Sequence, residues 1–231
     1  MLDRLLAPFM VGFLGIAFAV WEWLRYWLNV EVTAFTAALA SVLAVVAVGY
    51  AVWRIVKFLP EARWLNLGLQ GEVAVGQCLD QLRGAGYHVF HDIPGDGWNV
   101  DHVVIGPGGV FAIETKTRSK PRGGQSEVAF DGETVRVNGY APDRDALAQV
   151  RASARQVKEI IEQTAGLDHY VRPVIIFPGW YTRTKAKSEV WVLNDTAFPK
   201  WVVNEAPRLD PDKVQRIAAG LAMYLRCSGK P

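Results

Sequence analysis

Two acids and a lysine lie in one short segment where a β-hairpin would bring their side chains together. Two apolar β runs flank the turn sequence Gly-Pro-Gly-Gly, which is typical of a tight connection. If Ile105 pairs with Val110 across this turn, Asp101 lies directly opposite Glu114. Directly opposed residues share a face of the sheet, with Cβ atoms about 5 Å apart. Lys116 follows Glu114 by two residues and shares that face. The spacing therefore predicts that two carboxylates and an ammonium group converge.

The strands that carry these charges are apolar on both faces, which is typical of strands inside a sheet. Acidic and basic groups in such strands are rarely buried unless they are paired or bind a metal. Two interpretations follow from the residues alone. Either the hairpin is interior and its acids bind a cation, or it is an edge hairpin whose charged end reaches solvent.

The longer pattern favours the first interpretation. An Asp, a short β turn and a Glu-x-Lys sequence form the arrangement of the PD-(D/E)xK nuclease superfamily, and the chain resembles its nuclease-related domain (NERD) branch. The motifs that carry the resemblance are Gly71-Glu72, Asn99-Val100-Asp101-His102-Val103-Val104-Ile105, Gly108-Gly109-Val110-Phe111 and Ile113-Glu114-Thr115-Lys116. The resemblance is densest over residues 66–120, extends to about residue 195, and does not cover the first sixty residues. Val100 precedes the first acid, where such sequences often have Pro.

This resemblance implies an α/β fold with a restriction-endonuclease-like core, in which helices flank a mixed central sheet. It also implies hydrolysis of phosphodiester bonds with Mg²⁺ or Mn²⁺, which oxygen ligands would hold. The implied catalytic residues are Glu72, Asp101, Glu114, Lys116 and Gln149. The implied metal ligands are Asp101, Glu114, Glu72 and the backbone carbonyl of Thr115. Lys116 would position or deprotonate the attacking water.

Two of these residues have a simpler interpretation on the sequence alone. Residues 66–83 predict a helix, and Glu72 could lie at the border of its apolar stripe, where acids favour the helix dipole. Gln149 falls in a helix predicted from Pro142-Asp143 to about Gln163, where a surface position is the commoner fate of a Gln. His102 follows Asp101 directly and is expected on the opposite face of the strand, packed or hydrogen-bonded in the core.

Cations near this hairpin suit a polyanionic substrate. The loop after Lys116 carries Arg118, Lys120 and Arg122, and phosphate contacts use such side chains. Residues 180–187 interleave aromatic side chains with Arg183 and Lys185, which predicts a stacking and phosphate-binding surface. An ordinary solvated loop explains the charges of the first segment as well.

The N-terminus holds two uncharged apolar runs of about the length needed to cross a bilayer. They predict spans at about 5–24 and 34–54, and aromatic residues cluster at the ends of both runs, as at membrane interfaces. A signal peptide is an alternative for the first run, because Ala17-Phe18-Ala19 resembles a cleavage site. A buried soluble bundle is the other alternative, but neither run has a polar face.

The cations that flank these spans indicate their orientation. Arg4 precedes the first span, and Arg54, Lys57 and Arg63 follow the second. Both ends are therefore expected in the cytoplasm. The sequence predicts a membrane hairpin over residues 1–60, ended by Pro60, and a nuclease-like domain over residues 61–231.

Bulk composition agrees with this organisation. A net charge of +2 and a hydrophobic fraction of 51% exclude a histone-like binder and a disordered chain. Two widely separated cysteines give no zinc motif. We expect a membrane-tethered, metal-dependent nuclease acting on nucleic acid, on DNA in preference to RNA. The alternative is a catalytically silent membrane scaffold that binds nucleic acid or recruits proteins.

Overall fold

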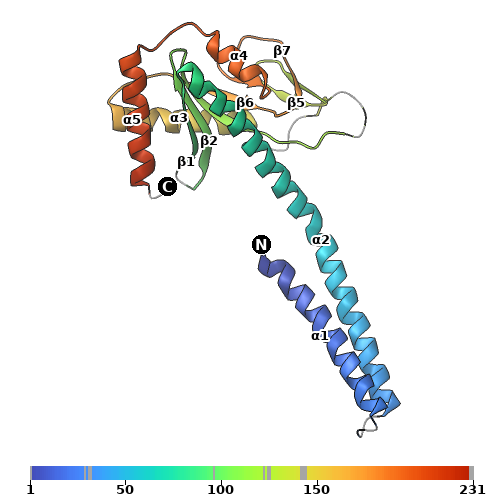
Figure 1. The fold of residues 1–231 in the computed structure, drawn as a ribbon. Helices are drawn as coiled ribbons and strands as arrows, with labels where there is room; N and C mark the ends of the chain where they lie inside the picture. Colours follow the sequence, from blue (N-terminus) through green and yellow to red (C-terminus); the bar gives the residue numbers. More distant parts are fainter. Residues whose placement is uncertain are drawn as a thin grey trace. The chain divides into compact units, whose positions relative to one another are not determined.

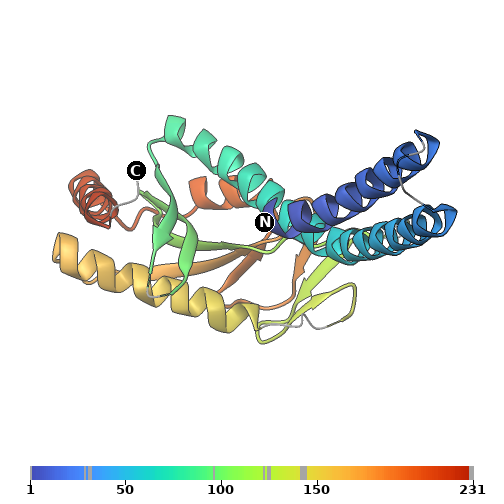
Figure 2. The same cartoon turned by 90° about the horizontal axis from the view of Figure 1, so that it is seen from below.

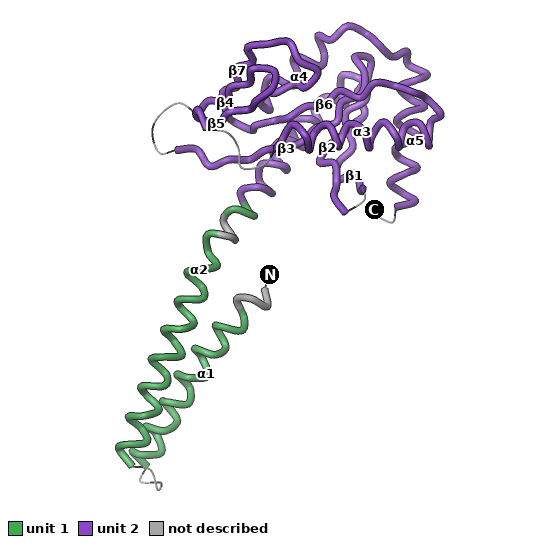
Figure 3. The backbone as a smooth tube through the Cα atoms, turned by 180° about the vertical axis from the view of Figure 1, so that it is seen from behind, with its two compact units in different colours: residues 1–66 green, residues 67–231 purple. Residues whose placement is uncertain are grey.

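The computed structural model describes residues 2–28, 30, 33–95, 97–121, 123, 126–140 and 145–228, without the side chains of residues 2–5 and 61–63. The chain divides into two compact units, Met1–Asn66 and Leu67–Pro231 (Figure 3). The division falls inside one long helix. The domain boundary after residue 60 stays a prediction.

Unit 1 is a helical hairpin made by α1 (Leu2–Trp27) and the first part of α2 (Ala34–Asp80). The two helices run antiparallel and side by side (Figure 1). They approach closely because small residues meet there: a Cβ on Gly15 would lie 3.1 Å from Ala47 Cβ. Small residues at such contacts are typical of helix pairs in membranes.

The remaining helix faces of unit 1 expose large apolar side chains. They include Phe9, Phe13, Trp21, Val42 and Val45. Leu6–Trp27 and Ala34–Ala85 are each long and apolar enough to cross a membrane. Such a surface is unfavourable in water and is consistent with a transmembrane hairpin.

The end of the membrane section at Pro60 stays a prediction. Pro60 lies inside α2, which continues to Asp80. A proline removes one backbone hydrogen bond from a helix and favours a kink, but the turns on either side keep their own bonds. The helix therefore passes through Pro60.

Unit 2 contains two sheets. The larger has the order β1-β2-β3-β6-β8 and comprises β1 (His88–Pro94), β2 (Asn99–Gly106), β3 (Gly109–Thr115), β6 (Val171–Ile176) and β8 (Trp191–Leu193). Its first three strands pair antiparallel, whereas β3, β6 and β8 run parallel. The smaller sheet has the order β5-β4-β7 and comprises β4 (Glu127–Phe130), β5 (Val135–Val137) and β7 (Tyr181–Thr184).

Helices cover both faces of the larger sheet (Figure 2). One face packs on α3 (Ala146–Ala165) and α5 (Pro211–Cys227). The other packs on the end of α2, on the 3₁₀ helix η1 (Gln81–Ala85) and on α4 (Ala197–Val203). The predicted mixed α/β class, with helices flanking a mixed sheet, is confirmed.

Helix caps explain where two of these helices begin. The Asp145 side chain accepts from two backbone N–H groups of the first turn of α3, and Asp210 accepts from Lys213 N at the start of α5. Such caps satisfy donors that the helix itself cannot. The predicted start of α3 at Pro142-Asp143 lies outside the described residues.

Candidate active site

The central hairpin forms with the predicted register. Ile105 pairs with Val110, and the turn between them needs Gly109, whose φ is +126°. The register places Asp101 and Glu114 on one face, which turns toward α3. The Asp101 carboxylate is fixed there, because Thr115 N donates a 2.7 Å hydrogen bond to its Oδ2.

A triangle of polar contacts surrounds Glu114. Lys116 Nζ donates to Glu114 Oε1 at 2.9 Å and to Gln149 Oε1 at 2.7 Å. The Gln149 amide Nε2 also donates to Glu114 Oε1. Gln149 lies in the first turn of α3, which the Asp145 cap holds in place. We call Glu72, Asp101, Glu114, Lys116 and Gln149 the acid centre.

Burial of the acid centre disfavours its negative charge. Glu114 is only 3% exposed, and desolvation, followed by the nearby Asp101 charge, raises its pKa to about 7. Burial is also the main cause that raises the pKa of Asp101. The Lys116 ammonium opposes these effects in part. The centre therefore gains stability from added positive charge.

One buried oxygen of the acid centre has no partner among the described residues. Glu114 Oε2 is buried and accepts no hydrogen bond from the residues that the structure describes. Leaving a buried acceptor unpaired is costly, so an oxygen-seeking cation fits this position. Mg²⁺ is usually held by one or two carboxylates and keeps several waters. Among the described residues no three His, Cys, Asp or Glu side chains form a cluster that could hold a metal ion.

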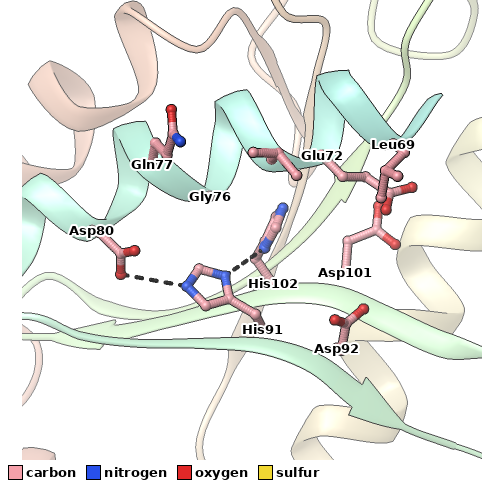
Figure 4. A pocket seen from close by; sticks show the side chains of 10 residues that line it. Leu69, Glu72, Gly76, Gln77, Asp80, His91, Asp92, Asp101 and His102 are labelled. Carbon is pink, nitrogen blue, oxygen red and sulfur yellow. Dashed lines mark hydrogen bonds and ion pairs between the residues drawn. The ribbon is translucent and has the colours of Figure 1, made fainter. Parts of the chain in front are cut away.

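Glu72 reaches the same region from α2. A Cβ on the preceding Gly71 would overlap the Thr117 side chain, so the glycine lets α2 approach the end of β3. Figure 4 shows the Glu72 and Asp101 carboxyl groups turned toward one another. Burial, followed by the charges of Asp101 and Asp92, raises the pKa of Glu72.

Asp92 is an acid of this region that the sequence analysis missed. It lines a cavity of about 250 Å³ together with Glu72 and Asp101, and Figure 4 shows it beside them. Its φ is +52°, a left-handed conformation that Asp tolerates better than most residues. An aspartate within an apolar run was the available signal in the sequence, but it does not indicate that conformation.

The expected position of His102 is confirmed. It is 5% exposed, and its Nδ1 lies 2.8 Å from Nδ1 of His91. His91 Nε2 lies 3.4 Å from Asp80 Oδ1, so the three side chains form a chain along one wall of the cavity (Figure 4).

The residues predicted to bind nucleic acid are dispersed. Lys120 is exposed and lies near Gly179, whereas Arg118 is half-buried. Arg183 forms an ion pair with Glu127 at 2.6 Å, which offsets its charge. Lys185 is exposed and lines a separate hollow. Arg122 lies outside the described residues.

The prediction that the aromatic side chains of residues 180–187 form a stacking surface is wrong for Trp180. This side chain is 2% exposed, and its Nε1 donates to the Arg118 carbonyl. Its apolar ring packs into the core between the two sheets, which outweighs the exposure expected of a polar segment. Tyr181 is 65% exposed.

Comparison with known proteins gives one match. The family described as nuclease-related domain (NERD) matches residues 67–178. This segment contains the whole acid centre and the strands and helix that position it. No curated protein and no solved structure matches the chain.

Proposed function

We propose that the chain is a divalent-metal-dependent nuclease, from the premise that its residues 67–178 form a nuclease-related domain. The reaction is hydrolysis of phosphodiester bonds in nucleic acid. The single observation that carries this proposal is the buried Glu114 carboxylate, whose Oε2 lacks a partner next to a second carboxylate.

Asp101 and Glu114 would hold Mg²⁺ or Mn²⁺, with the Thr115 carbonyl as a further oxygen ligand and with Glu72 completing the site through a water. Each of the two central carboxylates keeps one oxygen outside its hydrogen bonds to the protein. Oδ2 of Asp101 and Oε1 of Glu114 are the atoms already bound. When bound, such an ion polarises a phosphate and lowers the pKa of a coordinated water.

Lys116 is the residue that would position or deprotonate the attacking water: as an ammonium it would orient the water, and only as a neutral amine could it take up the water's proton. Its ammonium is held by Glu114 and Gln149, so its orientation is fixed before substrate arrives. A preorganised cation at this place also stabilises the negative charge that develops on the phosphorus centre. The Gln149 amide positions both charged groups and has no proton of its own to transfer.

The substrate and the location follow from less specific features. Lys120 and Lys185 are exposed cations outside the centre and would contact phosphates. DNA is the proposed substrate in preference to RNA.

The apolar helices would tether the domain to a lipid bilayer, and Arg54 and Lys57 after the second span favour a cytoplasmic location. A reporter enzyme that is active only in the cytoplasm should therefore be active when it is fused to the C-terminus.

Cleavage by the full chain in detergent micelles tests the proposal. Labelled single-stranded DNA, duplex DNA and RNA are incubated with Mg²⁺, Mn²⁺ or EDTA. We expect cleavage with metal only, and a loss of about 100-fold or more in the Glu114→Gln variant. Glu133→Gln is the matched control, because Glu133 is exposed in a hairpin turn. A wild-type chain that binds these substrates without cutting them would instead be a silent binding protein.

A further inference from the structure

We propose that a hollow between β8, α4 and the segment before β8 binds a nucleotide of a single-stranded nucleic acid, with its base on Trp201 and its phosphates on the surrounding cations. This inference names a substrate class and rests on the proposed function. The hollow has a volume of about 690 Å³. We call it the basic pocket, and its principal residues are Arg172, Lys185, Lys187, Trp191, Trp201 and Arg208.

Two indole rings form a corner in the basic pocket. Trp191 and Trp201 lie with centroids 5.4 Å apart and an interplanar angle of 78°. The Arg172 guanidinium lies 4.7 Å from the Trp191 centroid, and Trp191 also contacts Phe111 of the core. Trp191 therefore serves as a fixed wall. Trp201 is 47% exposed and presents a ring on which a flat base can stack.

The charge of the basic pocket suits phosphates. Four cations line it, and Glu205 is the one acid among its lining residues. The Glu205 carboxylate is already engaged by Arg208 at 2.7 Å. Lys185 and Lys187 are exposed and lie in the segment that borders the hollow. Phosphate binding needs such accessible cations.

The sheet topology separates the basic pocket from the acid centre. In the parallel pair β3 and β6, Phe111 lies beside Arg172 near the start, and Glu114 lies beside Ile175 three residues later. Three residues along a strand span about 10 Å. Phe111 and Glu114 also face opposite sides of the sheet. A strand of several nucleotides could therefore occupy both sites, but a single nucleotide could not.

The geometry favours unpaired bases over other anionic ligands. A base inside a duplex is stacked on its neighbours and hydrogen-bonded to its partner, so it cannot lie on Trp201. Lipid headgroups offer the same phosphate charge but no flat ring for the indole corner. An indole face beside cations is the combination typical of single-strand binding.

Binding of a fluorescein-labelled ten-nucleotide oligothymidylate to the full chain in neutral detergent micelles tests this proposal. The titration is done in EDTA, so cleavage does not enter the result. We expect Trp201→Ala to weaken binding by about 5- to 150-fold and Trp201→Phe to keep most of the affinity. Tyr140→Ala is the matched control, because Tyr140 is 79% exposed outside the pocket, and it should bind like wild type.

The cations and the competing ligands give independent readouts. The double variant Lys185→Gln, Lys187→Gln should lower the slope of log affinity against log salt by about 1.4, or about 0.7 for each lost contact. A duplex of the same length should not respond to Trp201→Ala. Dihexanoyl-phosphatidylglycerol below its micelle concentration should not displace the oligonucleotide.

Several outcomes would overturn the basic pocket as a base-binding site. They are unchanged binding in Trp201→Ala, equal losses in Trp201→Ala and Trp201→Phe, a duplex that depends equally on Trp201, or displacement by the lipid. The last result would indicate a headgroup site. None of them concerns the metal. Failure of the proposed nuclease would appear instead as intact, Trp201-dependent binding without cleavage in Mg²⁺ or Mn²⁺.

Discussion

The acid centre and the basic pocket belong to the same domain and have opposite physical properties. In the acid centre the charges are buried, with Glu114 3% exposed and its pKa raised to about 7. In the basic pocket the cations are largely exposed, and Trp201 keeps 47% of its surface accessible. Burial makes a charge depend on a specific partner, whereas exposure lets a charge contribute mainly through long-range attraction.

This difference assigns separate tasks to the two sites. A buried, hydrogen-bonded cluster is preorganised and acts on the reacting atoms. An exposed cationic surface with an aromatic ring raises affinity and tolerates many sequences. Changes in the acid centre should therefore alter rate at constant affinity, and changes in the basic pocket should alter affinity at constant rate.

The largest effect should come from Lys116→Ala. Single-turnover cleavage at saturating substrate should slow by about 10²- to 10⁴-fold, because a group that assists proton transfer is lost. Oligonucleotide affinity in EDTA should stay within about twofold of wild type. A parallel loss of affinity would break the proposed division, because Lys116 would then be one more phosphate contact.

A second prediction concerns stability against pH without metal. The folded-state pKa of Glu114 is about 7, above its usual 4.5, so the folded chain binds more protons between these values. The contribution of Glu114 to stability should be greatest below about pH 4.5 and should fall as the pH rises through about 7, by a few kcal/mol at most. Asp101 and Glu72 shift in the same direction. Burial lowers the pKa of His102 to about 4, and this contributes with the opposite sign, so the Glu114 effect is measured against a variant that lacks it. Thermal unfolding of the full chain in EDTA measures this.

Glu114→Gln sharpens that measurement, because it removes the main titrating group. The melting temperature of wild type, taken relative to that of the variant at each pH, should therefore fall between pH 4.5 and 7. Saturating Mn²⁺ should reduce the pH dependence of wild type as well, since the ion stabilises the ionised carboxylates. A difference between wild type and Glu114→Gln that stays constant over this pH range would contradict the burial argument.

The smallest effect should come from Gln149→Ala. The amide orients Glu114 and Lys116 but neither carries charge nor transfers a proton. We expect the cleavage rate to fall by about tenfold. The pH at which the rate is half-maximal should also shift, because the Lys116–Glu114 pair loses its hydrogen bonds to the Gln149 amide. Gln163→Ala, exposed on the same helix, is the control. A merely structural role would lower stability and leave the pH profile unchanged.

The sequence predicted the acid centre better than the basic pocket for a physical reason. Strand alternation and a short turn fix the positions of Asp101 and Glu114 from local spacing alone. Trp191 and Trp201 belong to different elements, and only the packing of α4 against the sheet brings them together. The sequence showed the cations of residues 180–187 but suggested the wrong aromatic partner, because Trp180 enters the core.

Two further features could not be predicted from local sequence patterns. The left-handed conformation of Asp92 and the close approach of Gly71 to Thr117 depend on contacts between distant segments. The hairpin register needed only strand alternation and turn chemistry, whereas the fold class was predicted from the family resemblance, and both are confirmed.

The central claim is that Asp101 and Glu114 hold a divalent ion. The most direct measurement is calorimetric titration of Mn²⁺ into the full chain in detergent micelles at pH 7.5. We predict that wild type and Lys116→Ala bind Mn²⁺, whereas Asp101→Asn and Glu114→Gln lose this binding and the accompanying rise in melting temperature. Equal Mn²⁺ binding by wild type and both carboxylate variants, or no binding by wild type, would contradict the account.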